Sequence, residues 1–323
     1  MSNKPPPKNI LLLGKDGQLG HALQTQLSAL GMVTAIGRET LDLERVATQA
    51  DDLNRLIGQV KPQVIVNAMA YTAVDRAEQE PDRAMAVNGV APGVLAKAAQ
   101  ACGACLVHYS SDYVFDGASN RFYIETDPTH PLSVYGQSKL AGEKQVATHC
   151  ADHLVLRTSW VYGAHGNNFL KTMLRLAGER ETLHVVNDQW GAPTGVDLLA
   201  STTVSVLRQQ LGLSLASPSP HVRDANWGLY HFAAAGETTW HTYAQFVIET
   251  AHRLAWPLKL SAAAIQGIAA SEYPVAAVRP QNSRLNTQRI SDTFGLQIPD
   301  WRVGVAAVVQ SLDPGQVLAS MKK

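Results

Sequence analysis

Tyr135 and Lys139, in the stretch Tyr135-Gly-Gln-Ser-Lys139, have types and a spacing that could move a proton. Residues four apart share one face of a helix, so the phenol and the ammonium would lie side by side. A phenol has a pKa of about 10, and a fixed positive charge nearby lowers it. The pair therefore predicts a general acid for a carbonyl oxygen. The spacing alone also fits a surface tyrosine beside a solvated lysine, so other elements must decide.

A glycine-rich turn stands near the N-terminus. The apolar run 10–13 predicts a buried parallel strand, and residues 21–30 predict a helix. Between them, Gly14, Gly17 and Gly20 have the spacing Gly-x-x-Gly-x-x-Gly, which departs from the dinucleotide fingerprint Gly-x-Gly-x-x-Gly. Such glycines let the backbone approach a pyrophosphate, whose charge the free N–H groups of a helix start favour. An ordinary strand-to-helix turn would use the same residues.

A second polar edge follows the apolar run 105–109, where the chain continues as Ser110-Ser111-Asp112. Open parallel sheets bind ligands at the carboxyl ends of their strands, so these hydroxyls would face a ligand. Serines after a strand are otherwise common turn formers.

Composition limits the classes of function. The chain has 323 residues with 27 basic and 27 acidic side chains, which gives no charge-driven affinity for nucleic acid or an anionic membrane. No apolar run approaches the roughly 20 residues that span a bilayer, and residues 1–8 predict a disordered start without a signal sequence. We therefore expect a cytoplasmic protein with a sizeable core.

Alternation of short apolar runs with helix-like segments predicts an α/β fold with a doubly wound parallel sheet. The expected strands are 10–13, 33–36, 64–67, 105–109 and 154–157, and the expected helices are 53–60, 87–101 and 135–149. After Trp160 the alternation becomes less regular. A smaller part begins there, with helices over 169–176, 198–211 and 242–254, a strand over 183–186 and an exposed loop over 214–224.

The three cysteines predict neither a disulfide nor a metal site. Cys102 ends an alanine-rich helix, Cys105 begins the next strand, and no second pair completes a tetrahedral set. Cys150 stands alone.

Together these motifs resemble the extended short-chain dehydrogenase/reductase superfamily and, within it, the dTDP-4-dehydrorhamnose reductase family. The resemblance spans nearly the whole chain in order, through segments that begin at Ala70, Pro131, Arg157, Gly166, Asn187 and Arg279. It implies a Rossmann-type domain over 9–165, using part of 195–232, with a smaller interleaved substrate domain over 166–194 and 233–323. The implied reaction reduces the C4 ketone of dTDP-4-dehydro-beta-L-rhamnose to dTDP-L-rhamnose with NAD(P)H.

The resemblance also implies roles for residues. Tyr135 would donate the proton, Lys139 would lower its pKa and bind the nicotinamide ribose, and Ser111 would bond the ketone or tyrosine oxygen. Ser111 stands where the family commonly has threonine, which keeps the hydroxyl. The substrate-binding residues would be Val74, Ser111, Asp112, Tyr135 and Trp160, although Trp160 could equally be a core aromatic. The cofactor-binding residues would be Gly14, Gly17, Gln18, Leu19, Arg38, Asp42, Leu43, Ala70, Tyr71, Thr72, Tyr135 and Lys139.

The cofactor prediction is NADPH, with NADH possible. A carboxylate at the end of the second strand usually selects NAD, but the chain here runs Gly37-Arg38-Glu39. Arg38 could pair with a 2′-phosphate, while Glu39 keeps NADH possible. Asp42 and Leu43 would meet the adenine, or would be a helix cap and a core contact.

Magnesium is not expected to be required. Family members can form dimers that share a magnesium ion, but two of the carboxylate positions fall on Ala22 and Ser311 and only Asp197 is acidic. We expect a monomer or a weak homodimer.

Other functions remain possible on the same scaffold. A nucleotide-sugar epimerase or dehydratase is one, although no glutamate follows Ser111-Asp112-Tyr113. A non-catalytic dinucleotide-binding regulatory subunit is another, although Ser111, Tyr135 and Lys139 are all present. The polar run from Arg279 to Leu285 is either a loop or a cleft wall with Arg279 or Arg284 available to a diphosphate.

Overall fold

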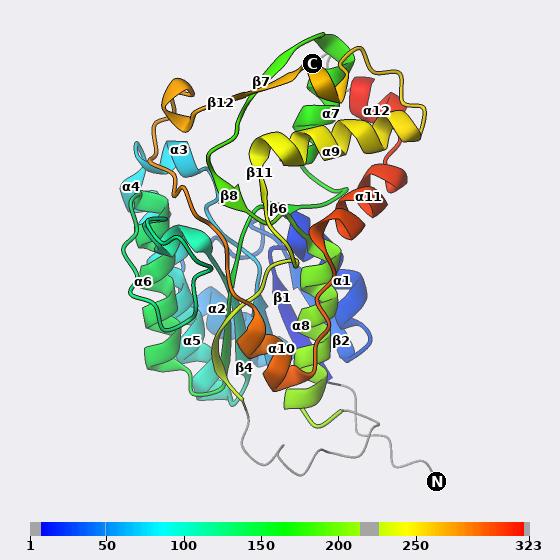
Figure 1. Ribbon diagram of the computed structural model, residues 1–323. Coiled ribbons are helices and arrows are strands. Elements are labelled where there is room, and N and C mark those ends of the chain that lie inside the picture. The colour runs from blue at the N-terminus through cyan, green and yellow to red at the C-terminus, as the bar shows by residue number, and fades with distance from the viewer. Residues whose placement is uncertain (1–7, 49, 214–225, 320–323) are drawn as a thin grey trace.

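The computed structural model describes residues 8–48, 50–213 and 226–319. Residues 1–7 of the expected disordered start and the loop expected over 214–224 lie outside this range, and Lys8 begins the first strand. A six-stranded parallel sheet forms the centre of the molecule (Figure 1). Its order is β10 (Gly228–His231), β5 (His153–Thr158), β4 (Cys105–Ser111), β3 (Val64–Asn67), β1 (Lys8–Leu13) and β2 (Gly31–Ile36).

The central strands are buried on both faces, which explains their continuous apolar sequences. Ile10, Leu11, Leu12 and Leu13 have no exposed surface, and all seven residues of β4 are buried. Only a sheet covered on both sides can hold such strands.

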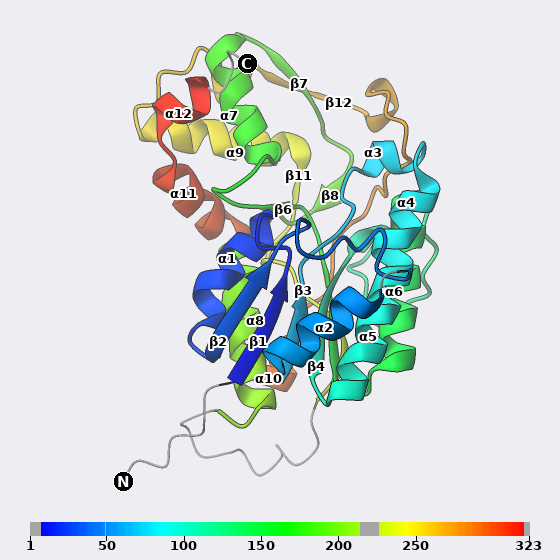
Figure 2. The same cartoon turned by 180° about the vertical axis from the view of Figure 1, so that it is seen from behind.

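Helices supply that cover on both faces, as the two opposite views show (Figures 1 and 2). One apolar cluster joins the sheet to α1 (Gln18–Leu27), α8 (Val196–Gln210) and α10 (Gln288–Phe294). The other joins it to α2 (Ala50–Val60), α5 (Ala91–Cys102) and α6 (Val134–His149). The predicted fold class, a Rossmann-type doubly wound parallel sheet with a smaller C-terminal part, is therefore confirmed.

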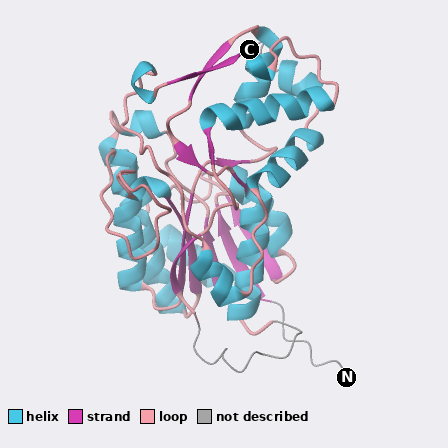
Figure 3. Ribbon diagram, viewed as in Figure 1, coloured by secondary structure: helices cyan, strands magenta, loops and turns pink. Residues whose placement is uncertain are grey.

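The smaller part lies over the carboxyl ends of the strands and is mostly helical (Figure 3). Its core contains the buried side chains of Tyr243, Val247 and Trp301. It is built from α7 (Phe169–Glu179), α9 (Trp240–Arg253), α11 (Trp301–Ser311) and α12 (Pro314–Ala319). Three short strand pairs complete it: β7 (Leu183–Val186) with β12 (Ile265–Ile268), β8 (Trp190–Gly191) with β11 (Thr238–Thr239), and β6 (Val161–Tyr162) with β9 (Thr194–Gly195).

The chain crosses between the two parts more than once. Strand β10 pairs with β5, and Ile290 and Phe294 of α10 pack in the core beside the sheet, although α10 lies between α9 and α11 of the smaller part in sequence. The domain boundaries drawn from the sequence stay a prediction.

The expected elements are present with shifted ends. The first helix begins at Gln18 rather than His21, so Gln18 and Leu19 belong to its first turn. The helix expected over 87–101 begins as a π-helix, Ala86–Val90, and continues as α5, which ends at Cys102 before Gly103 at φ +70°. The helices α3 (Val74–Ala77) and α4 (Pro81–Met85) precede it. No helix among the described residues is long and apolar enough to span a bilayer.

A buried ion pair fixes α6 to the sheet. Arg157 Nε and Nη2 of β5 donate to the two carboxylate oxygens of Glu143 at 2.8 and 2.7 Å, and both side chains are 5% exposed. Removing one partner of such a pair leaves a buried charge without compensation.

Replacing this carboxylate tests that role. Glu143→Gln is expected to lower the free energy of unfolding by about 3–5 kcal/mol, because Arg157 stays buried without its counterion. Urea unfolding measures the change. The control Arg55→Gln breaks the exposed Arg55–Asp52 pair and is expected to have a much smaller effect. Equal losses in the two variants would contradict a stabilising role for the buried pair.

Candidate active site

The carboxyl ends of the central strands surround a cavity of about 620 Å³ beneath the smaller part. The turn after β1 contributes Gly17, the loop after β3 contributes Ala70 and Thr72, and β4 ends in Ser110 and Ser111. This is the edge at which parallel sheets bind ligands.

Tyr135, Lys139 and Ser111 meet in this cavity. Helix α6 begins beside Ser133, whose hydroxyl accepts the Gly136 N–H at 3.2 Å, so Tyr135 lies in its first turn. Lys139 lies one turn later, and its Nζ donates to the Tyr109 carbonyl at 2.6 Å. The Ser111 hydroxyl lowers the Tyr135 pKa through a hydrogen bond. The structure thus brings together the three predicted catalytic side chains.

The Tyr135 pKa differs from the sequence-based expectation. We expected Lys139 to lower it, but burial and then the Asp112 carboxylate raise the pKa of Tyr135 to about 12. Lys139 is itself buried, which lowers its pKa to about 8, while the charge of Glu143 acts in the opposite direction. The expected lowering is therefore wrong, because desolvation and the Asp112 charge outweigh the hydrogen bond from Ser111 that lowers the pKa of the phenol. The phenol is neutral at pH 7.

Asp112 places a buried carboxylate on the cavity wall. Its Oδ1 accepts the Ser111 hydroxyl at 2.9 Å, whereas its Oδ2 is buried and has no hydrogen-bond partner among the described residues. Burial raises the Asp112 pKa to about 6, although hydrogen bonds from Ser283 and Ser111 oppose the shift. The hydroxyls of Ser110 and Thr158, which also line the cavity, are likewise buried and have no partner in the part of the chain that the structure describes. Unpaired buried polar atoms are costly, so this wall suits a polar ligand.

Trp160 is both a packed aromatic and a wall of the larger cavity. Its ring stacks on Trp240 with 3.7 Å between centroids and packs against the core of the smaller part. It also lines the cavity and is only partly buried. A Cβ on Gly191 would lie 2.6 Å from the indole, so a glycine there admits the ring.

A second cavity, of about 240 Å³, adjoins the first and shares Asp16, Gly17, Ala68 and Ala70 with it. Gly14 turns the chain with φ +95°, and a Cβ on Gly20 would lie 1.8 Å from the Gly14 carbonyl oxygen. The α1 N-terminus carries neither a side-chain cap nor an acidic residue in its first turn. These features fit the pyrophosphate of a dinucleotide.

Every predicted cofactor or substrate residue lines one of these cavities. The larger holds Gly17, Gln18, Leu19, Ala70, Thr72, Val74, Ser111, Asp112, Tyr135, Lys139 and Trp160. The smaller holds Gly14, Gly17, Arg38, Asp42, Leu43, Ala70 and Tyr71. Their binding roles stay predictions.

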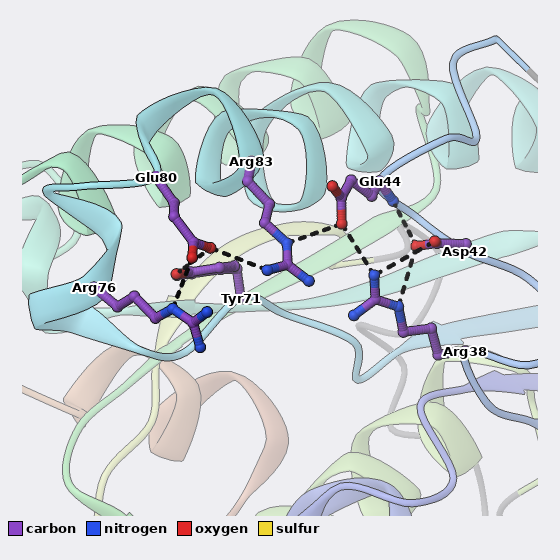
Figure 4. Close-up of polar contacts among 7 residues, drawn as sticks. All are labelled: Arg38, Asp42, Glu44, Tyr71, Arg76, Glu80 and Arg83. Carbon is purple, nitrogen blue, oxygen red and sulfur yellow. Dashed lines mark hydrogen bonds and ion pairs between the residues drawn. The ribbon is translucent and has the colours of Figure 1, made fainter.

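The carboxylates at the second strand differ from the expected arrangement. Glu39, which was to keep NADH possible, pairs with Lys15 at 3.1 Å and lines neither cavity. Arg38 lines the smaller cavity but already contacts Asp42 at 3.4 Å and Glu44 at 3.0 Å (Figure 4). Sequence reasoning missed Glu44, Arg83 and Trp240, because none belongs to a motif and packing alone brings them to the site. Tyr113 also lines the larger cavity, although it was given no role within the segment Ser111-Asp112-Tyr113.

The two C-terminal arginines also have partners. Arg279 contacts Asp75 of α3 at 2.8 Å and lines a third cavity, of about 260 Å³, which shares Phe169 and Trp240 with the largest one. Arg284 contacts Glu237 at 2.6 Å and lines none of the three.

No group of three or more His, Cys, Asp or Glu side chains could hold a metal ion within the ranges that the structure describes. Asp197 lies in the first turn of α8, Ala22 in α1 and Ser311 at the end of α11. The magnesium question stays a prediction.

Comparison with known proteins identifies close relatives. The profile of the RmlD substrate binding domain family matches residues 8–313. The chain is 47% identical over 304 residues to a dTDP-4-dehydrorhamnose reductase from Shigella flexneri, covering 94% of this chain and 98% of that protein. It is 44% identical over 303 residues to a protein of the same name from Burkholderia thailandensis, covering 94% and 98%.

Solved structures of similar proteins share the fold of this chain. A dTDP-4-dehydrorhamnose reductase from Bacillus anthracis in complex with NADP has a TM-score of 0.82 and 31% identity, covering 95% of this chain and 100% of that one. One from Clostridium acetobutylicum has a TM-score of 0.82 and 31% identity, covering 93% and 98%.

The titration of Asp112 should make the free energy of unfolding depend on pH. Its pKa is raised from 3.8 to about 6, so the unfolded chain loses this proton first as the pH rises. The stabilisation of the folded protein by protonated Asp112 is fully present below pH 3.8 and is lost as the pH rises through about 6. Across this interval the free energy of unfolding of the wild type should fall by an amount on the order of 3 kcal/mol through this group. In Asp112→Asn that decrease should be absent.

Urea midpoints across that pH range measure the effect. The control Asp292→Asn, at an exposed side chain, should keep the wild-type profile. If Asp112→Asn also keeps that profile, the buried carboxylate does not titrate as described.

Proposed function

The chain belongs to the RmlD substrate binding domain family, and we propose on this premise that it is an NAD(P)H-dependent oxidoreductase with dTDP-4-dehydrorhamnose reductase activity. It reduces the C4 ketone of dTDP-4-dehydro-beta-L-rhamnose to dTDP-L-rhamnose, the last step in the synthesis of that nucleotide sugar. The observation that carries the proposal is the meeting of Tyr135, Lys139 and Ser111 in one cavity of a closely related chain.

Tyr135 has the protonation state that a reduction requires. When bound, the reduced nicotinamide supplies the hydride. Negative charge then develops on the ketone oxygen, and the neutral Tyr135 phenol donates its proton there. Because an alkoxide is a stronger base than a phenolate, a Tyr135 pKa of about 12 still permits this transfer.

Ser111 and Lys139 support the transfer. The Ser111 hydroxyl donates to Asp112 Oδ1 and accepts the Tyr113 N–H. Rotation of its O–H from Asp112 to the ketone oxygen would orient that oxygen toward Tyr135. Lys139 carries charge at pH 7 because its pKa of about 8 lies above that value, and it stabilises the tyrosinate left after proton transfer. Its remaining N–H groups can donate to the nicotinamide ribose.

The sugar would contact Asp112, Val74 and Trp160, which line the same cavity. Asp112 Oδ2 can accept a hydrogen bond from a sugar hydroxyl, and the Trp160 ring can cover an apolar face of the sugar.

Cofactor preference is proposed as NADPH, with NADH accepted. Arg38 on the wall of the smaller cavity supports it, as does the relative that binds NADP. The proposed location is the cytoplasm, and the proposed partner is the nucleotide-sugar substrate, with no nucleic acid or membrane involved.

Removing the phenolic hydroxyl tests the proposal directly. Tyr135→Phe is expected to lower kcat by about 10²–10⁴-fold, because the proton donor is lost while the ring still packs. Cofactor absorbance with dTDP-4-dehydrorhamnose made in situ, with NADPH and NADH in parallel, gives the rates. Cofactor binding by the variant is the control for folding. Wild type that binds cofactor but does not turn over would favour the binding-protein or other-substrate alternatives.

Assembly without magnesium is a separate expectation. Ala22 and Ser311 leave Asp197 as a single carboxylate at the positions considered, which makes a poor magnesium site. Sedimentation with and without EDTA should give the same monomer or weak homodimer. A dimer that dissociates in EDTA and reforms with Mg²⁺ would refute this.

A further inference from the structure

One carboxylate oxygen contacts two arginines on the wall of the smaller cavity. Glu44 Oε2 accepts from Arg38 Nη2 at 3.0 Å and from Arg83 Nε at 2.9 Å (Figure 4). Arg38 follows β2 and Arg83 belongs to α4, 45 positions further along the chain, so only the fold brings them together. Two guanidinium groups around one anionic oxygen form an arrangement that suits a phosphate.

All three side chains line the cavity that also holds Gly14, Gly17 and Leu43. Leu43 is the residue expected to meet the adenine, so these side chains lie where the adenosine end of a dinucleotide would bind. Arg76, at the far end of the same network, contacts Glu80 at 2.7 Å and lines neither cavity.

A contact with Glu80 orients the Arg83 side chain. Its Nη1 donates to Glu80 Oε2 at 3.0 Å, and Glu80 also accepts the Tyr71 hydroxyl at 3.0 Å. These contacts do not involve Glu44, so the guanidinium keeps its bond to Glu80, which Tyr71 also holds, when Glu44 leaves. Less conformational freedom is then lost on binding an anion.

The Glu44 contacts are easily exchanged. The side chains of Arg38, Glu44 and Arg83 are 61%, 34% and 32% exposed, so water screens their attraction. A phosphate monoester offers more charge and three acceptor oxygens to the same donors. Glu44 and the phosphate would compete for the same N–H groups.

Resting on the proposed cofactor function, we propose that Arg83 joins Arg38 in binding the 2′-phosphate of NADP(H), and that Glu44 is the counterion that this phosphate displaces. With NAD(H), Glu44 stays and accepts a hydrogen bond from the 2′-hydroxyl. Glu44 therefore weakens NADP(H) binding and supports NAD(H), which sets the preference of the protein between the two cofactors. It takes the role that the sequence assigned to Glu39.

The test uses two nucleotides that differ only in the 2′-phosphate, adenosine 2′,5′-bisphosphate and adenosine 5′-monophosphate. Isothermal titration calorimetry of the full chain gives both dissociation constants without sugar or turnover. Arg83→Gln is expected to weaken the bisphosphate by about 10-fold or more, because charge-assisted hydrogen bonds are lost, and to leave the monophosphate within about twofold. Glu44→Gln is expected to shift the ratio of the two constants at least about fivefold toward the bisphosphate.

Arg76→Gln is the matched control, since it removes an arginine of the same network that does not line the cavity. It should leave both constants unchanged. Equal weakening of both nucleotides by Arg83→Gln, or an unchanged ratio in Glu44→Gln, would overturn the proposal. Loss of sugar reduction with this discrimination intact would instead count against the proposed reaction alone.

Discussion

Glu143 of α6 and Arg157 of β5 meet through two short hydrogen bonds where water hardly reaches either side chain. Their pairing fixes the helix that carries Tyr135 and Lys139 against the strands that end at the cavity. The Lys139 bond to the Tyr109 carbonyl adds a second attachment one turn away. Because proton transfer depends on distances of about 3 Å, the site depends on this attachment of one helix to the sheet.

The same burial determines the protonation states in the site. Desolvation keeps Tyr135 neutral, brings the Lys139 pKa to about 8 and raises that of Asp112 to about 6. At pH 7 the shifts of Lys139 and Asp112 cost folding free energy because both groups stay charged, whereas Tyr135 is neutral in the folded and the unfolded chain and its shift costs none. Each shift leaves a group able to donate or accept when a ketone and a cofactor enter. A neutral phenol suits reduction, in which the protein gives a proton to the substrate. Hydroxyl and carboxylate oxygens left unpaired at the cavity wall belong to the same compromise between stability and binding.

Local patterns predicted the sheet, its covering helices and the side chains proposed as catalytic, because each of these is specified by residues close together in sequence. Apolar runs predicted buried strands, and the four-residue spacing of Tyr135 and Lys139 predicted a shared helix face. Features that depend on distant contacts could not be predicted. The Tyr135 pKa depends on burial by other elements, and the side-chain direction of Glu39 depends on Lys15. Glu44 and Arg83 carry no motif and meet only because α4 packs beside the turn after β2.

The most direct test of the reductase account follows the hydrogen itself. The protein would be given NADPH deuterated at the nicotinamide C4 on the transferred face, together with dTDP-4-dehydrorhamnose, and the product would be analysed by mass spectrometry and NMR. The account predicts dTDP-L-rhamnose with one deuterium on C4 of the sugar, while the proton on its new hydroxyl comes from Tyr135 and exchanges with water. A product without that deuterium, formed while the cofactor keeps its label, would contradict direct hydride transfer to the ketone.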